Sequence, residues 1–341
     1  MDSKAYMIFV PFYGDNAYIA NMKKCWEHFY TVISLERAEN NLYLLLNTKT
    51  VVLNWIESWL TQEHKKCLIR YKLLGIKIIW VYHNRMPHST VAEPEQIENA
   101  RKNMDFIARI SDVIIIHSQN SRKYLMELIH QRKKIFYIPH IDYENQYRWL
   151  TEKTRDSDGI FRFVFQGRIA PYKNIELLIQ AFETLKLPNS QLHIAGKPIS
   201  EEYGNKIAKL CKNNHVFLRL GFLSDCEVGE EIQKGDVVVL PYDLKSSMNS
   251  GAMIAAFSNR RTVIISNNAM AQDYREKDFL YVYEYLDEED HCEQLKKIMQ
   301  CAYYNGIIQN KEKGRKAYKF TRINNSEAAV VEHLKEVVMS L

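Results

Sequence analysis

The stretch "FQGRIAPYKNIELLIQAF", residues 165–182, decides how this sequence is interpreted. An apolar strand is expected to end at Gly167, Arg168 follows directly, and Lys173 precedes a helix. Glycine lets the backbone turn and a ligand approach closely. Arginine offers a forked pair of donors, lysine a movable point charge, and a helix N-terminus unpaired N–H groups. The stretch therefore predicts an anion site suited to phosphates; the alternative is a surface loop with two solvated cations.

Short apolar runs, typical of strands buried on both faces, recur along the whole chain. Those runs are residues 6–11, 41–46, 77–82, 112–117 and 134–139, followed by 161–167, 191–196, 215–221, 236–241 and 262–266. Longer amphipathic segments such as 94–110 separate them. Alternation of this kind predicts α/β architecture with parallel sheets covered by helices on both faces, here two tandem Rossmann-like, doubly wound domains.

A polar stretch at 142–159 interrupts this alternation and marks a domain boundary. With 341 residues the chain is longer than most single domains. We expect an N-terminal domain at 1–150, a C-terminal domain at 151–322, and a terminal helix at 323–341 that is capped near Ser326 and crosses back to the first domain.

Composition is that of a soluble globular protein, with 46% apolar and 26% charged residues. Residues 1–155 hold 22 basic and 16 acidic residues, a net charge of +6, whereas the remainder holds 24 and 25, a net charge of −1. A basic half can serve nucleic acid, an anionic membrane surface or an acidic substrate, and it can also be a solvated face.

The six cysteines show neither a C-x-x-C pair nor a zinc-finger spacing to histidine, so reduced thiols in a cytoplasmic protein are expected. No apolar run reaches the roughly 18 residues of a transmembrane helix, and the N-terminus lacks a secretory signal. No cluster of His, Asp and Glu suggests a required metal ion. We expect a cytoplasmic protein, or one held peripherally at the inner face of the membrane.

Ligands of doubly wound sheets bind beyond the carboxyl ends of the strands, so the residues after each strand are candidates. Asn249, Ser250 and Gly251 stand where a helix is expected to begin, and their backbone amides could meet another phosphate. Ordinary N-capping explains the same residues equally well.

Two further strand ends carry candidates. Ser224 and Glu227 form an expected capping box, and Phe222 with Leu223 offers a surface for a flat ligand; the capping is the safer inference. In the first half His83 directly follows an expected strand, as a catalytic candidate or as a structural histidine. Further candidates on that side, which could line an acceptor site, are Gly14, Asp15, Asn16, Asn84 and His88.

Together these residues resemble the donor site of glycosyltransferases with the GT-B fold, especially glycosyltransferase family 4. The resemblance implies two domains facing a cleft, with Arg168 and Lys173 neutralising the diphosphate of a nucleotide sugar. "HIAGKP", which contains Gly196, is similar to a later donor-site segment of that family, and "IIWVYHNRMPHS" resembles the segment whose histidine, here His83, faces the transferred sugar.

One departure from the family concerns two glutamates that it typically carries with seven residues between them. Aligning Gly251 with the family's glycine places Met248 and Ala256 at those positions. In the family these carboxylates approach the donor sugar and hold the nucleotide ribose. Ribose recognition here must use other groups, and the family's retaining stereochemistry is left open.

The function implied by the resemblance is sugar transfer from a UDP- or GDP-sugar to a glycan or lipid-linked acceptor, without a metal cofactor, in cell-surface polysaccharide synthesis. An N-terminal domain resting on an anionic membrane through Trp55, Trp59, Leu60 and the basic stretches 64–72 and 130–134 is one hypothesis for the acceptor side; core packing of the tryptophans is the other. The alternative function is a non-catalytic sugar-nucleotide-binding partner of a glycan-building enzyme. An NAD-dependent oxidoreductase lacks its G-x-G-x-x-G motif, and no nucleic-acid-binding module is recognisable.

Overall fold

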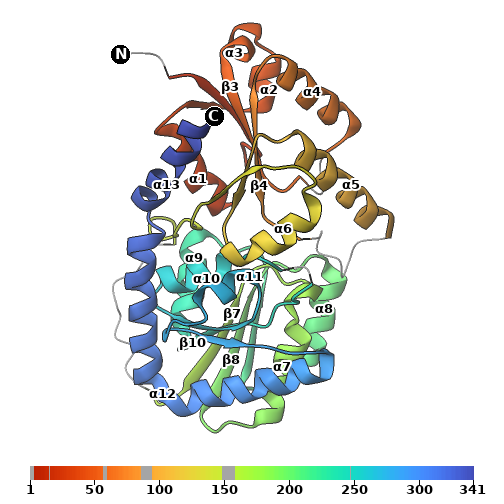
Figure 1. Cartoon of the computed structure of the whole chain (residues 1–341). Helices are drawn as coiled ribbons and strands as arrows, with labels where there is room; N and C mark the ends of the chain where they lie inside the picture. Colours follow the sequence, from red (N-terminus) through yellow and green to blue (C-terminus); the bar gives the residue numbers. More distant parts are fainter. Residues whose placement is uncertain (1–3, 15, 57–59, 86–93, 148–157, 246) are drawn as a thin grey trace. The chain divides into compact units, whose positions relative to one another are not determined.

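The structure, a computed structural model, describes residues 4–14, 16–56, 60–85, 94–147, 158–245 and 247–341. The chain forms two compact units (Figure 1). Unit 1 comprises Met1–Ile141 together with Asn324–Leu341, and unit 2 comprises Asp142–Ile323. Each unit is an α/β domain with its own parallel sheet.

Unit 1 contains, in its described part, a six-stranded parallel sheet in the order β2-β1-β3-β4-β5-β6. Its strands are β1 Tyr6–Val10, β2 Thr31–Ile33, β3 Thr48–Leu53, β4 Lys77–Tyr82, β5 Val113–Ile116 and β6 Lys134–Tyr137. The central strands are mainly apolar because helices cover both faces, and β5, with the sequence VIII, is buried at every residue.

The helices of unit 1 are α1 Ala17–Glu27, α2 Leu35–Glu39, α3 Leu42–Leu46, α4 Gln62–Leu73, α5 Pro94–Ile110, η1 Gln119–Ser121, α6 Arg122–Leu128 and α13 Glu327–Ser340. Helix α13 lies beside α1 (Figure 1). The Ser326 hydroxyl caps α13 by accepting the Ala329 N–H at 3.4 Å. The buried Asn325 amide donates to the His140 carbonyl at 2.7 Å, which fixes this terminal segment to unit 1.

The prediction of a strand at 41–46 is wrong, because these residues form α3 and the strand is the next segment, β3. The Asn41 side chain caps α3 by accepting the Leu44 N–H at 3.2 Å. The helix exposes Leu42, Tyr43 and Leu46, whereas the β-branched run of Thr48–Leu53 enters the sheet. The other apolar runs fall on strands, and residues 94–110 form the expected helix α5.

Unit 2 also contains, among its described residues, a six-stranded parallel sheet, in the order β12-β11-β10-β7-β8-β9. Its strands are β7 Phe161–Gln166, β8 Ser190–Gly196, β9 Val216–Leu220, β10 Val237–Leu240, β11 Thr262–Ser266 and β12 Tyr281–Tyr283. Its helices are η2 Pro171–Lys173, α7 Ile175–Leu185, α8 Glu201–Leu210, α9 Asp225–Lys234, α10 Gly251–Ser258, α11 Ala269–Tyr274 and α12 Glu288–Asn324, which is broken at Gly306.

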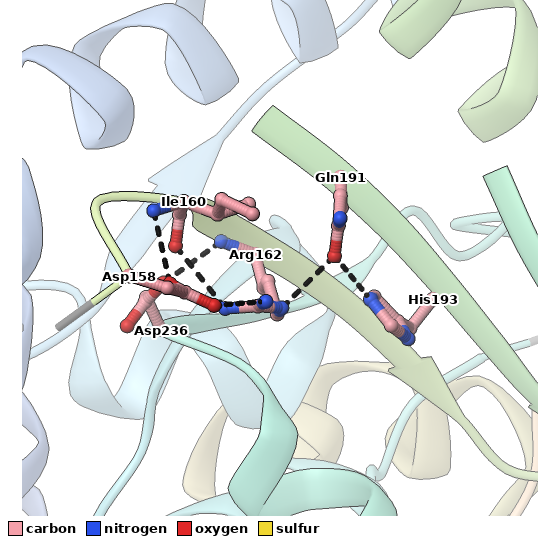
Figure 2. Close-up of polar contacts among 6 residues, drawn as sticks. All are labelled: Asp158, Ile160, Arg162, Gln191, His193 and Asp236. Carbon is pink, nitrogen blue, oxygen red and sulfur yellow. Dashed lines mark hydrogen bonds and ion pairs between the residues drawn. The ribbon is translucent and has the colours of Figure 1, made fainter. Parts of the chain in front are cut away.

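The amino edge of the unit 2 sheet is closed by a polar network around Arg162, at the start of β7 (Figure 2). The Arg162 guanidinium donates to both Asp158 oxygens at 3.1 and 2.5 Å and to Gln191 Oε1 at 2.9 Å. Gln191 Oε1 also meets His193 at 3.1 Å, and the Arg162 amide donates to Asp236 at 2.8 Å. The cation of Arg162 is therefore neutralised within the fold.

The described helices include none that is long and apolar enough to cross a bilayer. All six cysteines lie in the described part of the chain, and every one is a free thiol.

Candidate functional site

The carboxyl edge of the unit 2 sheet begins with two glycines that the backbone requires. Gly167 directly follows β7 at φ 142°, and Gly196 ends the neighbouring β8 at φ 152°. A Cβ on Gly196 would lie 1.8 Å from the Gly167 carbonyl oxygen, so no side chain fits there. The Gly167 N–H donates to Ala195 at 3.1 Å, and the close approach of the strand ends brings the loop after β7 to the sheet edge.

The loop after β7 is fastened to the loop after its other neighbour, β10. The Asp243 N–H donates to the Tyr172 carbonyl at 2.9 Å, and the Asn174 amide donates to the Pro241 carbonyl at 2.9 Å. Asn174 itself has left-handed backbone geometry, φ 52° and ψ 46°, which asparagine tolerates better than most residues, and α7 begins after it. Two loops far apart in the sequence thus form one surface.

Lys173 lies at the junction of these two loops. Its ammonium nitrogen is 3.4 Å from the ring centroid of Tyr242 and 4.8 Å from that of Tyr172. Burial lowers the pKa of Lys173 to about 7, because its charged form loses water. Ring faces attract a cation but do not neutralise it. Within the described residues no carboxylate pairs with Lys173.

Arg168 is exposed directly after Gly167. Its guanidinium forms neither an ion pair nor a hydrogen bond with any residue that the structure describes. Two cations from one loop therefore lie at a sheet edge where the described part of the fold provides no anion for them. This arrangement suits an external anion with several oxygens, such as a diphosphate.

The loop after β10 ends at the expected helix start. The Ser250 hydroxyl caps α10 by accepting the Met253 N–H at 3.1 Å, and Gly251 is the first residue of the helix. Asn249 directly precedes this cap. Met248 and Ala256, which occupy the positions of the missing glutamates, are buried, with 2% and 0% of their surface exposed.

A group of residues that the sequence analysis missed holds this loop in place. The Tyr285 hydroxyl accepts the Leu244 N–H at 3.0 Å and donates to the Tyr242 carbonyl at 3.3 Å, and the Ser266 hydroxyl donates to that same carbonyl at 2.7 Å. The Tyr285 ring stacks flat on His291, with centroids 3.7 Å apart. The sequence signal for the tyrosines around Lys173 was a Pro-Tyr pair in each of the two loops, at residues 171–172 and 241–242.

Phe222 and Leu223, the candidates for contact with a flat ligand, follow β9, a third strand that ends at this sheet edge. The Gly221 N–H donates to the Gly196 carbonyl at 3.0 Å, so the loop after β9 adjoins the end of β8. Phe222 is 67% exposed, whereas Leu223 is buried. The predicted capping box is confirmed, because Glu227 Oε2 accepts from the Ser224 hydroxyl at 2.7 Å and from its N–H at 2.8 Å. These bonds hold the pKa of Glu227 at about 2.

In unit 1 the candidates gather at the carboxyl edge of that unit's own sheet. His83 follows β4 and is buried, and its Nε2 bonds Asn54 Oδ1 at 3.0 Å. Burial lowers the pKa of His83 well below its ordinary value, with His117 and His140 adding to the effect. Asn84 is half-buried next to it.

The loop after β1 provides the remaining candidates of unit 1. Gly14 is exposed at φ 136°, and the Asn16 side chain caps α1 by accepting the Tyr18 N–H at 2.9 Å. Asp15 and His88 lie outside the described residues. Among those that are described, no group of His, Cys, Asp and Glu side chains could hold a metal ion.

Residues 150–316 match the family model described as "Glycosyl transferases group 1". A GDP-mannose:glycolipid 4-beta-D-mannosyltransferase of Xanthomonas campestris pv. campestris is 26% identical over 130 residues, which cover 37% of this chain and 37% of that protein. A second sequence of that name is 25% identical over 151 residues, 43% of this chain and 42% of that protein. The chain thus matches about two fifths of the length of these curated relatives.

Solved structures resemble the chain over nearly its whole length. Anabaena Alr3699/HepE in complex with UDP-glucose superposes with a TM-score of 0.70 at 15% identity, covering 99% of this chain and 100% of that one. Sucrose-phosphate synthase of Thermosynechococcus elongatus gives a TM-score of 0.76 at 12% identity, covering 98% of both chains. At these identities the likeness shows the fold, and the predicted GT-B fold is confirmed.

Proposed function

Because this chain belongs to the group 1 glycosyltransferases, whose family model its residues 150–316 match, we propose that it transfers a sugar from a UDP- or GDP-sugar to a glycan or lipid-linked acceptor in cell-surface polysaccharide synthesis. The observation that carries the proposal is the pair Arg168 and Lys173, two cations at the carboxyl edge of the unit 2 sheet that no described carboxylate neutralises. Gly167, Gly196 and the helix start at Asn249–Gly251 complete the donor site in this proposal.

The proposed mechanism follows from charge development. Breaking the anomeric C–O bond leaves positive charge on the sugar and negative charge on the departing diphosphate. Only groups that bind this charge more tightly in the transition state than in the ground state increase the rate. Arg168 provides a forked donor to paired phosphate oxygens, and Lys173 leaves its tyrosine rings to provide a point charge. In unit 1 we assign the contact to the transferred sugar to His83.

Metal independence is part of the proposal, because the two cations supply the charge that a divalent ion would otherwise supply. Activity should then persist in EDTA. The stereochemical outcome is the family's retention in this proposal, despite Met248 and Ala256 at the glutamate positions. The anomeric configuration of the product, measured by NMR, tests it.

The acceptor side is proposed to be a lipid-linked glycan, since the two curated relatives are named for a glycolipid acceptor. Helix α4 supports a membrane contact. Its exposed residues Lys66, Ile69, Arg70 and Leu73 recur at the spacing of one helix face, and Leu73 is 83% exposed. A face that combines cations with exposed apolar side chains suits an anionic bilayer surface.

Other parts of the expected membrane surface have structural roles instead. Leu60 is buried, and Trp59 lies outside the described residues. The Lys133 ammonium donates to the Arg109 carbonyl at 2.6 Å and the Ser111 carbonyl at 2.8 Å, so it caps the end of α5. The proposed membrane contact therefore rests on α4 alone, and Ile69→Glu combined with Leu73→Glu should abolish co-sedimentation with acidic liposomes.

The test of the function is transfer of radiolabelled sugar from GDP-mannose and from UDP-glucose into a lipid extract of the source cells. Incorporation by the wild type, lost in Arg168→Ala and kept in Lys209→Ala, supports the proposal. Lys209 is a matched control, since it is an exposed lysine in the last turn of α8, away from the strand ends. No incorporation from any sugar nucleotide, with intact nucleotide binding, favours the alternative, a non-catalytic sugar-nucleotide-binding partner.

A further inference from the structure

The carboxyl edge of the unit 1 sheet carries a cluster of rings, of which the proposed donor chemistry uses His83 alone. Asn54 follows β3, His83 follows β4, His117 follows β5, and His140 lies three residues beyond β6. Tyr18, on α1, lies among the three imidazoles, with ring centroids 5.0 to 5.3 Å from each. Because β3 to β6 are neighbours in the sheet, their ends bring these side chains together in one buried cluster.

Hydrogen bonds hold this cluster in one arrangement. His117 Nδ1 lies 2.8 Å from the Ile138 carbonyl, which can only accept, so His117 Nε2 accepts the Tyr18 hydroxyl at 2.7 Å. The Asn54 amide donates to the Val10 carbonyl at 3.0 Å, so its Oδ1 accepts the His83 Nε2–H. Burial lowers the pKa of His117 to about 3 and that of His140 to about 4, which leaves both rings uncharged.

Trp55 covers this cluster on the outside. Its indole stacks on His83 with ring centroids 4.6 Å apart and an interplanar angle of 24°, and it meets Tyr18 edge-on at 5.6 Å. Trp55 is partly exposed, whereas His83 is 6% exposed. A ligand that approaches this sheet edge therefore meets the indole of Trp55 before it meets the imidazole of His83.

The backbone of Trp55 is strained. Its φ of 46° lies in the left-handed region, which is uncommon for a bulky side chain. Such strain persists only where surrounding structure enforces it, and it occurs preferentially at ligand sites. Here Leu53 and Ile56 on either side are buried, and the turn directs a tryptophan to the sheet edge where ligands of α/β sheets bind.

We propose that Trp55 is a stacking platform for a pyranose ring, a site that rests on the proposed transferase function and adds a second sugar contact to unit 1, beside His83. The C–H groups on one face of a pyranose pack against an indole, and the backing imidazole and phenol keep the indole from turning. The cluster beneath is uncharged, so the platform presents an apolar, electron-rich face.

That face selects among ligand classes. An electron-rich ring face repels a phosphate, so the platform does not duplicate the anion site of unit 2. A lone cation is disfavoured because residues 1–155 carry a net charge of +6. A neutral sugar has both an apolar face for the indole and hydroxyls for the polar surroundings, which is the combination that this edge offers.

The direct test is saturation-transfer NMR on the full chain with methyl α-D-mannopyranoside and methyl β-D-glucopyranoside as probes. The variants are Trp55→Asn, which removes the ring but tolerates a left-handed φ, and Trp55→Phe, which keeps a ring. Tyr43→Ala is the matched control, since Tyr43 is an aromatic of the same unit that is 67% exposed. Thermal unfolding checks that each variant is folded.

We expect saturation of the pyranoside ring protons in the wild type, in Trp55→Phe and in Tyr43→Ala, and its loss in Trp55→Asn. KM for the sugar should rise about ten-fold in Trp55→Asn. A rise for GDP-mannose but not for GDP binding identifies the donor sugar as the occupant; a rise confined to the acceptor identifies the acceptor sugar. Unchanged pyranoside saturation in a folded Trp55→Asn overturns the proposal.

This outcome is separable from the proposed function. Nucleotide binding depends on Arg168 and Lys173 and should be unaffected by Trp55→Asn. If the wild type binds GDP or UDP but Trp55→Asn leaves pyranoside saturation unchanged, the Trp55 proposal alone is contradicted. If the protein neither binds a nucleotide nor transfers a sugar, the transferase proposal itself is contradicted.

Discussion

One arginine lies near each end of strand β7, and the two side chains differ in their hydrogen-bond partners. Arg162, at the amino end, bonds both oxygens of Asp158 and the Gln191 side chain (Figure 2). Arg168, just past the carboxyl end, has no such partner among the described residues. An arginine whose donors are already used stabilises the fold, whereas one whose donors remain available can bind a ligand. The predictions below test that contrast.

The largest expected effect is at the carboxyl end. Arg168→Ala should lower kcat/KM for sugar transfer by about a hundred-fold or more, because it removes a donor to the charge that develops on the diphosphate. The free energy of unfolding in urea should stay within about 0.5 kcal/mol of the wild type, since the side chain is exposed and forms no hydrogen bond or ion pair with a described residue. A fall in stability with unchanged transfer would reverse the assignment.

At the amino end the opposite result is expected. Arg162→Ala should lower the free energy of unfolding by about 2 kcal/mol, because it removes charge-assisted hydrogen bonds to a mostly buried guanidinium. Asp158 is 40% exposed, so water can solvate it again and the loss stays moderate. Nucleotide affinity per folded molecule, measured by calorimetry, should be unchanged; a loss of affinity would place Arg162 within the site's support.

The next effect in size is a pH dependence of nucleotide binding, which we expect from the pKa of Lys173. Its pKa is lowered to about 7 by burial, and Tyr172, Tyr242 and the exposed Arg168 are the titratable groups nearest to it. The ammonium binds a diphosphate and the free amine does not, so UDP or GDP affinity should fall up to about ten-fold per pH unit above that pKa.

The same lowered pKa of Lys173 should change the stability of the protein with pH in the opposite direction to nucleotide affinity. Between about 7 and the ordinary lysine value near 10.4, the unfolded chain binds more protons than the folded one, so the nucleotide-free protein should become more stable as pH rises. Lys173→Met is the control and should remove both trends. An affinity that is flat from pH 6 to pH 9 would show that the lysine does not meet the diphosphate.

The smallest effect concerns the support beneath the site. Tyr285→Phe keeps the stack on His291 but loses the hydroxyl that holds Leu244 and the Tyr242 carbonyl. Removing these bonds should weaken nucleotide binding by roughly five-fold, about 1 kcal/mol. His291→Phe, which keeps a ring against Tyr285, should bind more like the wild type. Unchanged nucleotide affinity in Tyr285→Phe would mean that the stack, which both variants keep, positions the loop without the hydroxyl.

Local pattern predicted most of the fold, because buried parallel strands are continuous apolar runs and the capping residues Ser224, Ser250 and Ser326 act locally. The family and the GT-B fold followed from the motif around Gly167 and are confirmed. The strand at 41–46 failed because "NLYLLL" is short and apolar enough for either element. Its asparagine caps decided for a helix, and Thr48–Leu53 took the place in the sheet.

Only those parts of the candidate site that are local in sequence could be predicted. Arg168 and Lys173 stand out within one loop, but their surroundings come from elsewhere in the chain. The ring of Tyr242 reaches Lys173 because β7 and β10 are neighbours, and Trp55 reaches His83 because β3 and β4 are neighbours. One sequence does not state which strands pair, so neither contact was visible in it.

The measurement that tests the central account most directly is calorimetric titration of GDP and UDP into the wild type, Arg168→Ala and Lys209→Ala in one buffer near pH 7. The account predicts that the wild type and Lys209→Ala bind one of these nucleotides equally and that Arg168→Ala binds it at least ten-fold more weakly. Equal binding by all three proteins would contradict it, because Arg168, which no described residue pairs, would then have no part in holding the diphosphate.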